Sequence, residues 1–152
     1  MIWGCMTSKG TGYICWVQGR MNTDFYLTIL EDELLQTIDY YKFEREKVIF
    51  QQDGTCPHTS PRVYKWLGAH KIGVLSWPAQ SPDLNLIEHL WDHLKRQLAK
   101  YKKEPEGVNE LWERVEKEWN DIPVDVYQNL IDSIERHVKA VRRVKGGYTK
   151  YQ

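Results

Sequence analysis

The stretch Val48-Ile49-Phe50-Gln51-Gln52-Asp53-Gly54 changes from apolar to polar residues halfway along its length. A short apolar run of β-branched and aromatic residues with polar flanks is typical of a strand buried in a sheet. The glutamines and the glycine after Phe50 predict that this strand opens into a loop. Asp53 is therefore expected at the carboxyl end of a buried strand, at an edge of the sheet.

Two strands and one helix are expected upstream of this stretch. Residues 1–6 and 13–17 have strand-like composition, and the turn Gly10-Thr11-Gly12 between them predicts a hairpin. Beyond Gly19, apolar residues recur at helical spacing after Thr23, which can cap a helix. The apolar stripe of this first helix consists of Tyr26, Leu30, Leu34 and Ile38.

Helices and strands continue to alternate downstream. Residues 62–69 predict a short helix and residues 72–77 a further strand, and Pro78 and Pro82 mark a loop. The clearest helix spans residues 86–98 and has one apolar face. That face consists of Ile87, Leu90, Trp91, Leu94 and Leu98.

The carboxyl-terminal third is expected to be helical. Residues 108–119 predict one helix, and Asp121 and Pro123 open another. The first apolar stripe consists of Val108, Leu111, Trp112, Val115 and Trp119, and the second of Val126, Leu130, Ile131, Ile134 and Val138. The order of elements indicates an α/β fold in which helices pack on a mixed sheet.

Composition narrows the class of protein. A chain of 152 residues with 41% hydrophobic content can bury one ordinary core, so one compact domain is expected. The 21 basic and 21 acidic residues cancel, so any affinity for nucleic acid must be local. No run approaches the ~20 apolar residues of a membrane helix, and three cysteines without a CxxC pair argue against a disulfide framework. We expect a soluble, intracellular protein without a membrane partner.

Two carboxylates are candidates for chemistry: Asp53 at the strand end, and Glu88 in the first turn of the helix after Pro82. Two carboxylates brought together repel unless a divalent cation lies between them, and their hard oxygens suit Mg²⁺ or Mn²⁺. Two such ions support phosphoryl transfer by activating the attacking oxygen and stabilising the leaving one. From the pattern alone a simpler interpretation is favoured, in which Asp53 caps a turn and Glu88 complements a helix dipole.

The sequence around these carboxylates resembles the second and third catalytic blocks of the mariner and Tc superfamily of transposases. The matching stretches are Gln51-Gln52-Asp53 through His58, Trp77 through Asn85, and Ile87-Glu88-His89-Leu90-Trp91. Thirty-four residues separate Asp53 from Glu88, the spacing characteristic of one large branch of that superfamily. Further similar stretches are Trp3-Gly4-Cys5, Gly19-Arg20-Met21-Asn22 with Tyr26, and Lys145 through Tyr151, so that the resemblance covers essentially the whole chain.

The resemblance implies a ribonuclease-H-like fold in which three acids bind two divalent ions, Mg²⁺ or Mn²⁺, for DNA cleavage and strand transfer. Asp53 and Glu88 would be the catalytic metal ligands, and His58 and Asn85 would support them. For His58, a plain hydrogen bond to the backbone is an equally good interpretation. Residues 1–152 would form a partial DDE transposase catalytic domain. We also expect DNA as partner, localisation in the nucleus, and a homodimer as one alternative for the oligomeric state.

Some features depart from the family pattern. The family's first catalytic aspartate lies on a strand just upstream of the segment that resembles Ile2 to Met6, and here the chain begins at Met1. Asp24 and Asp32 do not replace it, because both fall on the predicted first helix. We therefore expect a ribonuclease-H-like mixed sheet that lacks its first, central strand, and impaired activity with weak metal binding. Gly54, where the family usually has asparagine, could loosen the support around the metal.

Two basic segments offer local charge for DNA. The first contains Lys95, Arg96, Lys100, Lys102 and Lys103, and the second contains Arg136, Lys139, Arg142, Arg143, Lys145 and Lys150. No acid lies among residues 136–152, so the second segment is the predicted DNA-binding surface. An alternative function is therefore a catalytically inactive, transposon-derived protein that binds nucleic acid or a partner through this segment. A helical α/β domain without a nucleic-acid role is a more distant alternative.

His89 and His93 lie four residues apart on the predicted helix, a spacing that can bind zinc. The residue after His89 is Leu90, whereas a metalloprotease helix carries a glutamate there. The zinc interpretation is therefore the weaker one.

Overall fold

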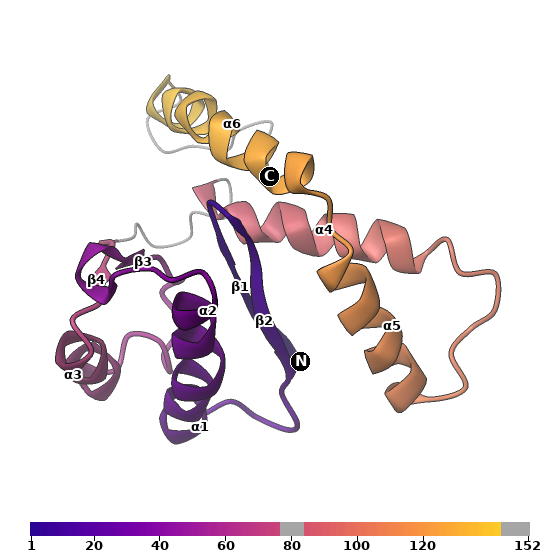
Figure 1. The fold of residues 1–152 in the computed structure, drawn as a ribbon, viewed down its shortest axis with the longest axis horizontal. Coiled ribbons are helices and arrows are strands. Elements are labelled where there is room, and N and C mark those ends of the chain that lie inside the picture. Colours follow the sequence, from indigo (N-terminus) through magenta and orange to yellow (C-terminus); the bar gives the residue numbers. More distant parts are fainter. Residues whose placement is uncertain (77–83, 144–152) are drawn as a thin grey trace. The chain divides into compact units, whose positions relative to one another are not determined.

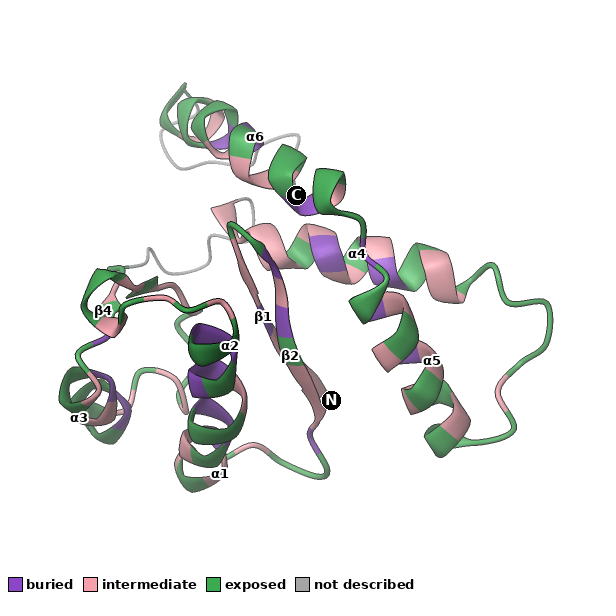
Figure 2. Ribbon diagram, viewed as in Figure 1, coloured by how far each residue is buried: buried purple, intermediate pink, exposed green. Residues whose placement is uncertain are grey.

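The computed structural model describes residues 1–76 and 84–143. The described residues form two compact units. Unit 1 comprises Met1–Cys5 and the described residues from Gly12 up to residue 76, and unit 2 comprises Met6–Thr11 and those from Leu84 onward. Figure 1 follows the chain through both units by colour, and Figure 2 shows that buried positions alternate with exposed ones along its helices.

The chain begins with the predicted hairpin, in which β1 (Ile2–Thr7) pairs with β2 (Gly10–Trp16). The turn falls at residues 8–9, so the prediction of a turn at Gly10-Thr11-Gly12 was wrong. The reason is the Thr7 hydroxyl, which accepts hydrogen bonds from the backbone amides of Lys9 and Gly10 at 3.1 and 3.2 Å. These bonds close the turn early and leave the glycines to β2.

Gly12 lies where β2 crosses the helix that follows it. A Cβ atom at this position would lie 2.7 Å from the Thr37 side chain and closer still to the sulfur of Cys5. Only a residue without a side chain allows that approach. The glycine is required here by packing.

The predicted first helix is confirmed as a continuous helical segment of α1 (Thr23–Ile29), the π-helical turn η1 (Leu30–Leu34) and α2 (Leu35–Tyr40). Its cap is Asn22 and not Thr23, because the Asn22 Oδ1 accepts a hydrogen bond from the Phe25 amide at 2.8 Å. The predicted stripe is buried, and it forms the core of unit 1 with residues from β1 and α3. These core residues include Trp3, Cys5, Tyr26, Leu30, Leu34, Ile38, Val63 and Leu67.

A second, parallel pair of strands follows, after the short 3-10 helix η2 (Arg45–Lys47). β3 (Ile49–Phe50) pairs with β4 (Gly73–Val74), and α3 (Pro61–Ala69) connects them. The Gly73 amide donates to the carbonyl of Val48 at 3.0 Å. The predicted strand at 72–77 is shorter than expected, and Trp77 with the Pro78–Pro82 loop lies outside the described residues.

The prediction that β3 is buried was wrong, because Ile49 is 69% exposed. β3 has β4 on one edge, and no other strand of the described residues pairs with it. The described strands thus form two separate two-stranded sheets instead of one mixed sheet. Asp24 and Asp32 lie on α1 and η1, as predicted.

Unit 2 contains α4 (Leu86–Leu98), α5 (Val108–Asn120) and α6 (Val124–Arg143). The bounds of α4 are those predicted. The indole rings of Trp91 and Trp119 stack with their centroids 4.8 Å apart, and Trp119 is completely buried. Of the predicted stripe on α5, Val108 and Leu111 are exposed.

The buried face of α6 differs from the prediction. Tyr127, Ser133 and His137 are buried, whereas Val138 is 38% exposed. The reason is polar pairing: the Tyr127 hydroxyl donates to the Lys9 carbonyl at 2.8 Å, and the Ser133 hydroxyl lies 3.3 Å from His137 Nε2. Because of these bonds, the buried face of α6 contains polar as well as apolar side chains. Across the described helices, none is long and apolar enough to cross a membrane.

Candidate active site

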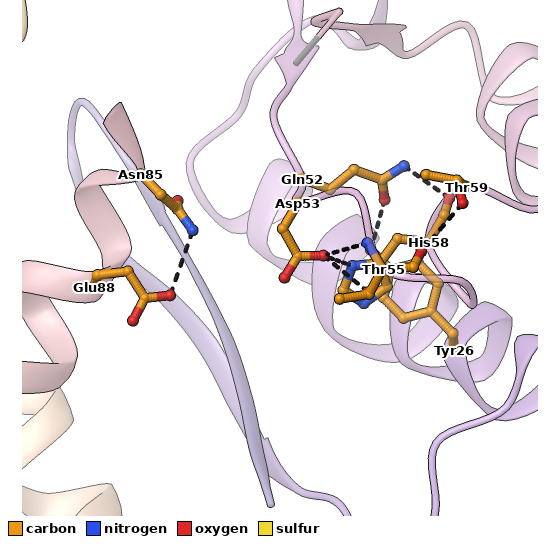
Figure 3. A network of polar contacts seen from close by, with 8 residues as sticks. All are labelled: Tyr26, Gln52, Asp53, Thr55, His58, Thr59, Asn85 and Glu88. Carbon is orange, nitrogen blue, oxygen red and sulfur yellow. Dashed lines mark hydrogen bonds and ion pairs between the residues drawn. The ribbon is translucent and has the colours of Figure 1, made fainter. Parts of the chain in front are cut away.

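Asp53 lies in the loop that leaves the carboxyl end of β3, as the sequence predicts. Its Oδ1 atom accepts hydrogen bonds from the Thr55 amide at 3.1 Å and from the Thr55 hydroxyl at 2.8 Å. The same oxygen lies 2.5 Å from Nδ1 of His58. Figure 3 shows these contacts converging on one side of the carboxylate.

The other oxygen of this carboxylate, Oδ2, has no hydrogen-bond or ion-pair partner among the residues that the structure describes. The Asp53 side chain is 47% exposed, so solvent and ions can reach it. Asp53 therefore has one oxygen anchored by the protein and one oxygen available to a ligand.

The contacts also fix the charge of Asp53. The hydrogen bond from His58 has the largest effect on the pKa of the Asp53 carboxyl. Burial opposes it, the two hydrogen bonds from Thr55 add to it, and together these effects lower the pKa from 3.8 to about 2. A carboxyl group that accepts several hydrogen bonds is stabilised as the anion. Asp53 is thus ionised throughout the neutral range, and an ionised hard oxygen is the kind of ligand that Mg²⁺ and Mn²⁺ take.

His58 is held next to Asp53 by two kinds of contact. Its ring lies against the ring of Tyr26, with centroids 4.1 Å apart, and its backbone amide donates to the carbonyl of Thr55 at 3.0 Å. The ring nitrogen of His58 contacts Asp53 directly, and its role beside a metal ion stays a prediction. The histidine side chain is only 14% exposed, so its ring is packed in place.

Glu88 lies in the first turn of α4 and is exposed. Its Oε1 atom accepts from the side-chain amide of Asn85 at 3.5 Å, and its backbone amide donates to the Asn85 carbonyl at 3.1 Å (Figure 3). Asn85, which was predicted to support the metal ligands, is thus in contact with Glu88. Glu88 belongs to unit 2 and Asp53 to unit 1, and their meeting at one metal ion stays a prediction.

Three residues around Asp53 lie in stretches that resemble the family but were not predicted as site residues. Thr55 could have been found, because an aspartate two residues before a threonine is a signal for a side-chain-capped turn. Gln52 and Tyr26 are brought to the site by the tertiary structure, where the Tyr26 hydroxyl donates to Gln52 Oε1 at 2.8 Å. Their separation along the sequence gave no signal of this bond.

The predicted DNA-binding residues that the structure describes lie on α6. Arg136, Arg142 and Arg143 are exposed, and Lys139 pairs with Glu135 at 2.6 Å. Lys145 and Lys150 lie outside the described residues. In the first basic segment, Lys95 and Lys103 each pair with a nearby acid, so that its free charge is smaller than its composition indicates.

No group of three histidine, cysteine or acidic side chains that could hold a metal occurs within residues 1–76 and 84–143. His93 Nε2 lies 3.0 Å from the side-chain nitrogen of Gln97, and the His89 ring contacts that of His137 at 5.5 Å between centroids. The two histidines of the zinc interpretation therefore have different neighbours. For Mg²⁺ or Mn²⁺, the ionised Asp53 with its available oxygen fits as one ligand.

Comparisons with known proteins show the family of this chain. A family model described as DDE superfamily endonuclease matches residues 1–122. The transposase of the element Tcb1 from Caenorhabditis briggsae is 36% identical over 155 positions, which cover 99% of this chain and 54% of that protein. The Tc1 transposase from Caenorhabditis elegans has the same identity and coverage. The chain therefore spans about half the length of the curated relatives it matches.

Solved structures show the fold. The catalytic domain of Mos1 transposase, determined with Raltegravir and Mn, has a TM-score of 0.86 at 19% identity, over 98% of this chain and 76% of that one. The Mos1 mariner paired end complex with Mn gives the same score over 44% of its chain. The ribonuclease-H-like α/β fold and the similarity to Tc and mariner transposases are thus confirmed. The chain belongs to the DDE superfamily endonuclease family.

Proposed function

We propose that residues 1–152 are a partial DDE catalytic domain that takes part in metal-dependent DNA cleavage and strand transfer, with Asp53 and Glu88 as ligands of Mg²⁺ or Mn²⁺. The observation that carries this proposal is the state of Asp53. Its carboxylate is ionised and anchored through Oδ1, while Oδ2 is left available. A turn cap requires only the hydrogen bond from the Thr55 amide, so the contact with His58 is additional to it.

The chemistry required of the protein is limited. Bound divalent ions supply charge stabilisation for the attacking and leaving oxygens of a phosphodiester. Asp53 offers its negative Oδ2 oxygen, and the contacts of His58 and Thr55 with Oδ1 fix the orientation of the whole carboxylate. Fixed orientation matters because a ligand that must be reoriented loses part of its binding energy.

DNA is the proposed partner, and both solved and curated relatives support it. One Mos1 structure is a paired-end complex with the left transposon end, and another is a Strand Transfer Complex. By analogy we propose nuclear localisation and consider a homodimer. We also propose that residues 1–152 tested on their own are impaired as an enzyme, because these residues contain no counterpart of the family's first catalytic aspartate.

The test is a nicking assay on supercoiled plasmid with the purified chain in Mn²⁺. We expect slow nicking that requires the metal and is lost in both Asp53→Asn and Glu88→Gln. Asp132→Asn, which changes an exposed acid on α6, is the matched control and should nick like the unmodified chain. Nicking that survives both Asp53→Asn and Glu88→Gln would reject the assigned site.

A second candidate function is supported by α6. Its exposed Arg136, Arg142 and Arg143 leave positive charge near the end of the helix. A catalytically inactive DNA-binding protein would use this charge alone. Salt-sensitive DNA binding without any Mn²⁺-dependent nicking would favour this candidate over the first.

A further inference from the structure

We propose that Tyr26 and Gln52 are positioning residues for the candidate active site. The Tyr26 hydroxyl, acting through the side-chain amide of Gln52, fixes the loop that holds His58 against Asp53. This inference rests on the proposed role of Asp53 and extends the site into the core of unit 1.

The first contact anchors Gln52 to a rigid element. Tyr26 lies on α1, is 0% exposed, and belongs to the hydrophobic core of unit 1. Its hydroxyl donates a hydrogen bond to Gln52 Oε1 at 2.8 Å. A buried phenol needs polar partners, and the Tyr26 hydroxyl has two, Gln52 Oε1 and the side chain of Trp3.

The second contact passes this restraint to the loop. Gln52 Nε2 donates to the backbone carbonyl of His58 at 2.9 Å. An amide side chain accepts only through its oxygen and donates only through its nitrogen. Because Gln52 uses both ends, its orientation is determined, and the carbonyl of His58 is tied to the core helix.

The third contact fixes the imidazole itself. The Tyr26 and His58 rings lie 4.1 Å apart between centroids, at an angle of 33°. Tyr26 thus holds His58 twice: its ring packs on the imidazole, and its hydroxyl restrains the backbone through Gln52 (Figure 3). With its ring and backbone both restrained, His58 presents Nδ1 to Asp53 at 2.5 Å.

The consequence concerns the direction of the Asp53 carboxylate. The loop from residue 51 to residue 60 contains no helix or strand, so the loop alone provides little rigidity. The hydrogen bonds that run from Tyr26 on the buried helix α1 through Gln52 to His58 make the loop rigid. If the restraint is released, His58 can leave Oδ1, and Asp53 is then free to rotate.

Two substitutions separate the two bonds. Tyr26→Phe removes the hydroxyl and keeps the ring that packs on His58. Gln52→Glu keeps an oxygen that can accept from Tyr26 but removes the N–H that donates to His58. Both variants should therefore loosen the loop, through different bonds.

The measurements are made on the full chain without metal or DNA. ¹⁵N and ¹H NMR of the His58 ring reports the hydrogen bond to Asp53, and amide hydrogen exchange at His58 and Thr59 reports the loop. Both of these amides donate to the Thr55 carbonyl. We expect each variant to lose the wild-type ring signature of His58 and to exchange these amides about tenfold faster, the effect of losing one hydrogen bond.

Matched controls lie on the surface of unit 1. Tyr64→Phe removes a hydroxyl from a tyrosine that is 46% exposed, and Gln36→Glu adds the same charge on an exposed position of α2. Both controls should keep wild-type His58 signals and exchange. If Tyr26→Phe does not fold, Gln52→Glu, which changes a half-buried side chain, decides alone.

Wild-type His58 signals and exchange in Gln52→Glu would overturn the proposal, whatever Tyr26→Phe does. Because neither measurement needs metal or DNA, failure of the nicking assay leaves this result standing. If both variants loosen His58 as expected but the chain never nicks DNA, that result would count against the proposed function only.

Discussion

Replacing His58 by phenylalanine removes the hydrogen bond to Asp53 and keeps an aromatic ring against Tyr26. The expected result is a rise in the pKa of the Asp53 carboxyl from about 2 toward its ordinary value of 3.8. The rise should be incomplete, because the two hydrogen bonds from Thr55 remain. His58→Asn, whose amide can donate to the same oxygen, should restore much of the lowered pKa.

The size of the effect on stability follows from the pKa. A carboxyl whose pKa falls from 3.8 to about 2 would contribute at most about 2.4 kcal/mol to the free energy of unfolding. Since the Asp53 side chain is 47% exposed, solvent screening reduces this contribution to about 1 kcal/mol. His58→Phe should lose most of that amount at neutral pH.

The pH dependence has a definite sign. The pKa of Asp53 is lower in the folded chain than in the unfolded chain, so its stabilising effect is full above about pH 4 and is lost as the pH falls through about 2. The difference in unfolding free energy between the wild-type chain and His58→Phe should therefore shrink between pH 4 and pH 2.

Urea unfolding at several pH values gives the free energies, and ¹³C NMR of the side-chain carboxyl gives the pKa. An Asp53 pKa that stays at about 2 in His58→Phe would refute the assignment of His58 as its main stabiliser. So would a difference in unfolding free energy that is independent of pH.

Three further changes test other parts of the structure. Gly12→Ala should destabilise the chain by about 1–3 kcal/mol in urea unfolding, because the added methyl group overlaps the Thr37 and Cys5 side chains. The unmodified chain should give little heat when titrated calorimetrically with Mn²⁺, because few anionic ligands are available, and Asp53→Ala should not change that. Binding of duplex DNA should weaken with salt at a log–log slope of roughly −3 to −4, and Arg142→Ala with Arg143→Ala should flatten the slope by about one to two.

For each of these three predictions, one result would contradict the physical reason given. Gly68→Ala is the matched control for Gly12→Ala, since nothing lies within 4 Å of its added atom, and equal stability of the two variants would contradict the packing argument. Tight Mn²⁺ binding that Asp53→Ala abolishes would point to a substitute ligand. A salt slope that persists without Arg142 and Arg143 would show that α6 does not contact the phosphates.

The sequence predicted the helices better than the strands. The bounds of α4 follow from its apolar stripe and its charged ends, which are local features. β3 is only Ile49–Phe50 and is exposed on one edge, because strand burial depends on neighbours that are distant in sequence. On α6, the buried face was wrong because Tyr127 and His137 pack through hydrogen bonds, which an apolar pattern cannot indicate.

The site was predicted in part. Asp53 was a candidate from its position at a strand end, and the resemblance added His58; the structure places the two in contact at 2.5 Å. Tyr26 was predicted as a core residue within a stretch that resembles the family, but not as part of the site, because the bond between its hydroxyl and Gln52 spans 26 residues. Side chains that meet through tertiary structure leave no periodic pattern in the sequence.

A shared metal site of Asp53 and Glu88 is tested most directly by paramagnetic broadening of side-chain carboxyl ¹³C signals with substoichiometric Mn²⁺. This measurement detects weak binding, because a small fraction of bound Mn²⁺ broadens every carboxylate near it. We predict that Asp53 and Glu88 broaden together, that the exposed Glu113 does not, and that Asp53→Asn removes the broadening at Glu88. Broadening of Glu88 that persists in Asp53→Asn, or that never occurs, would contradict the shared site.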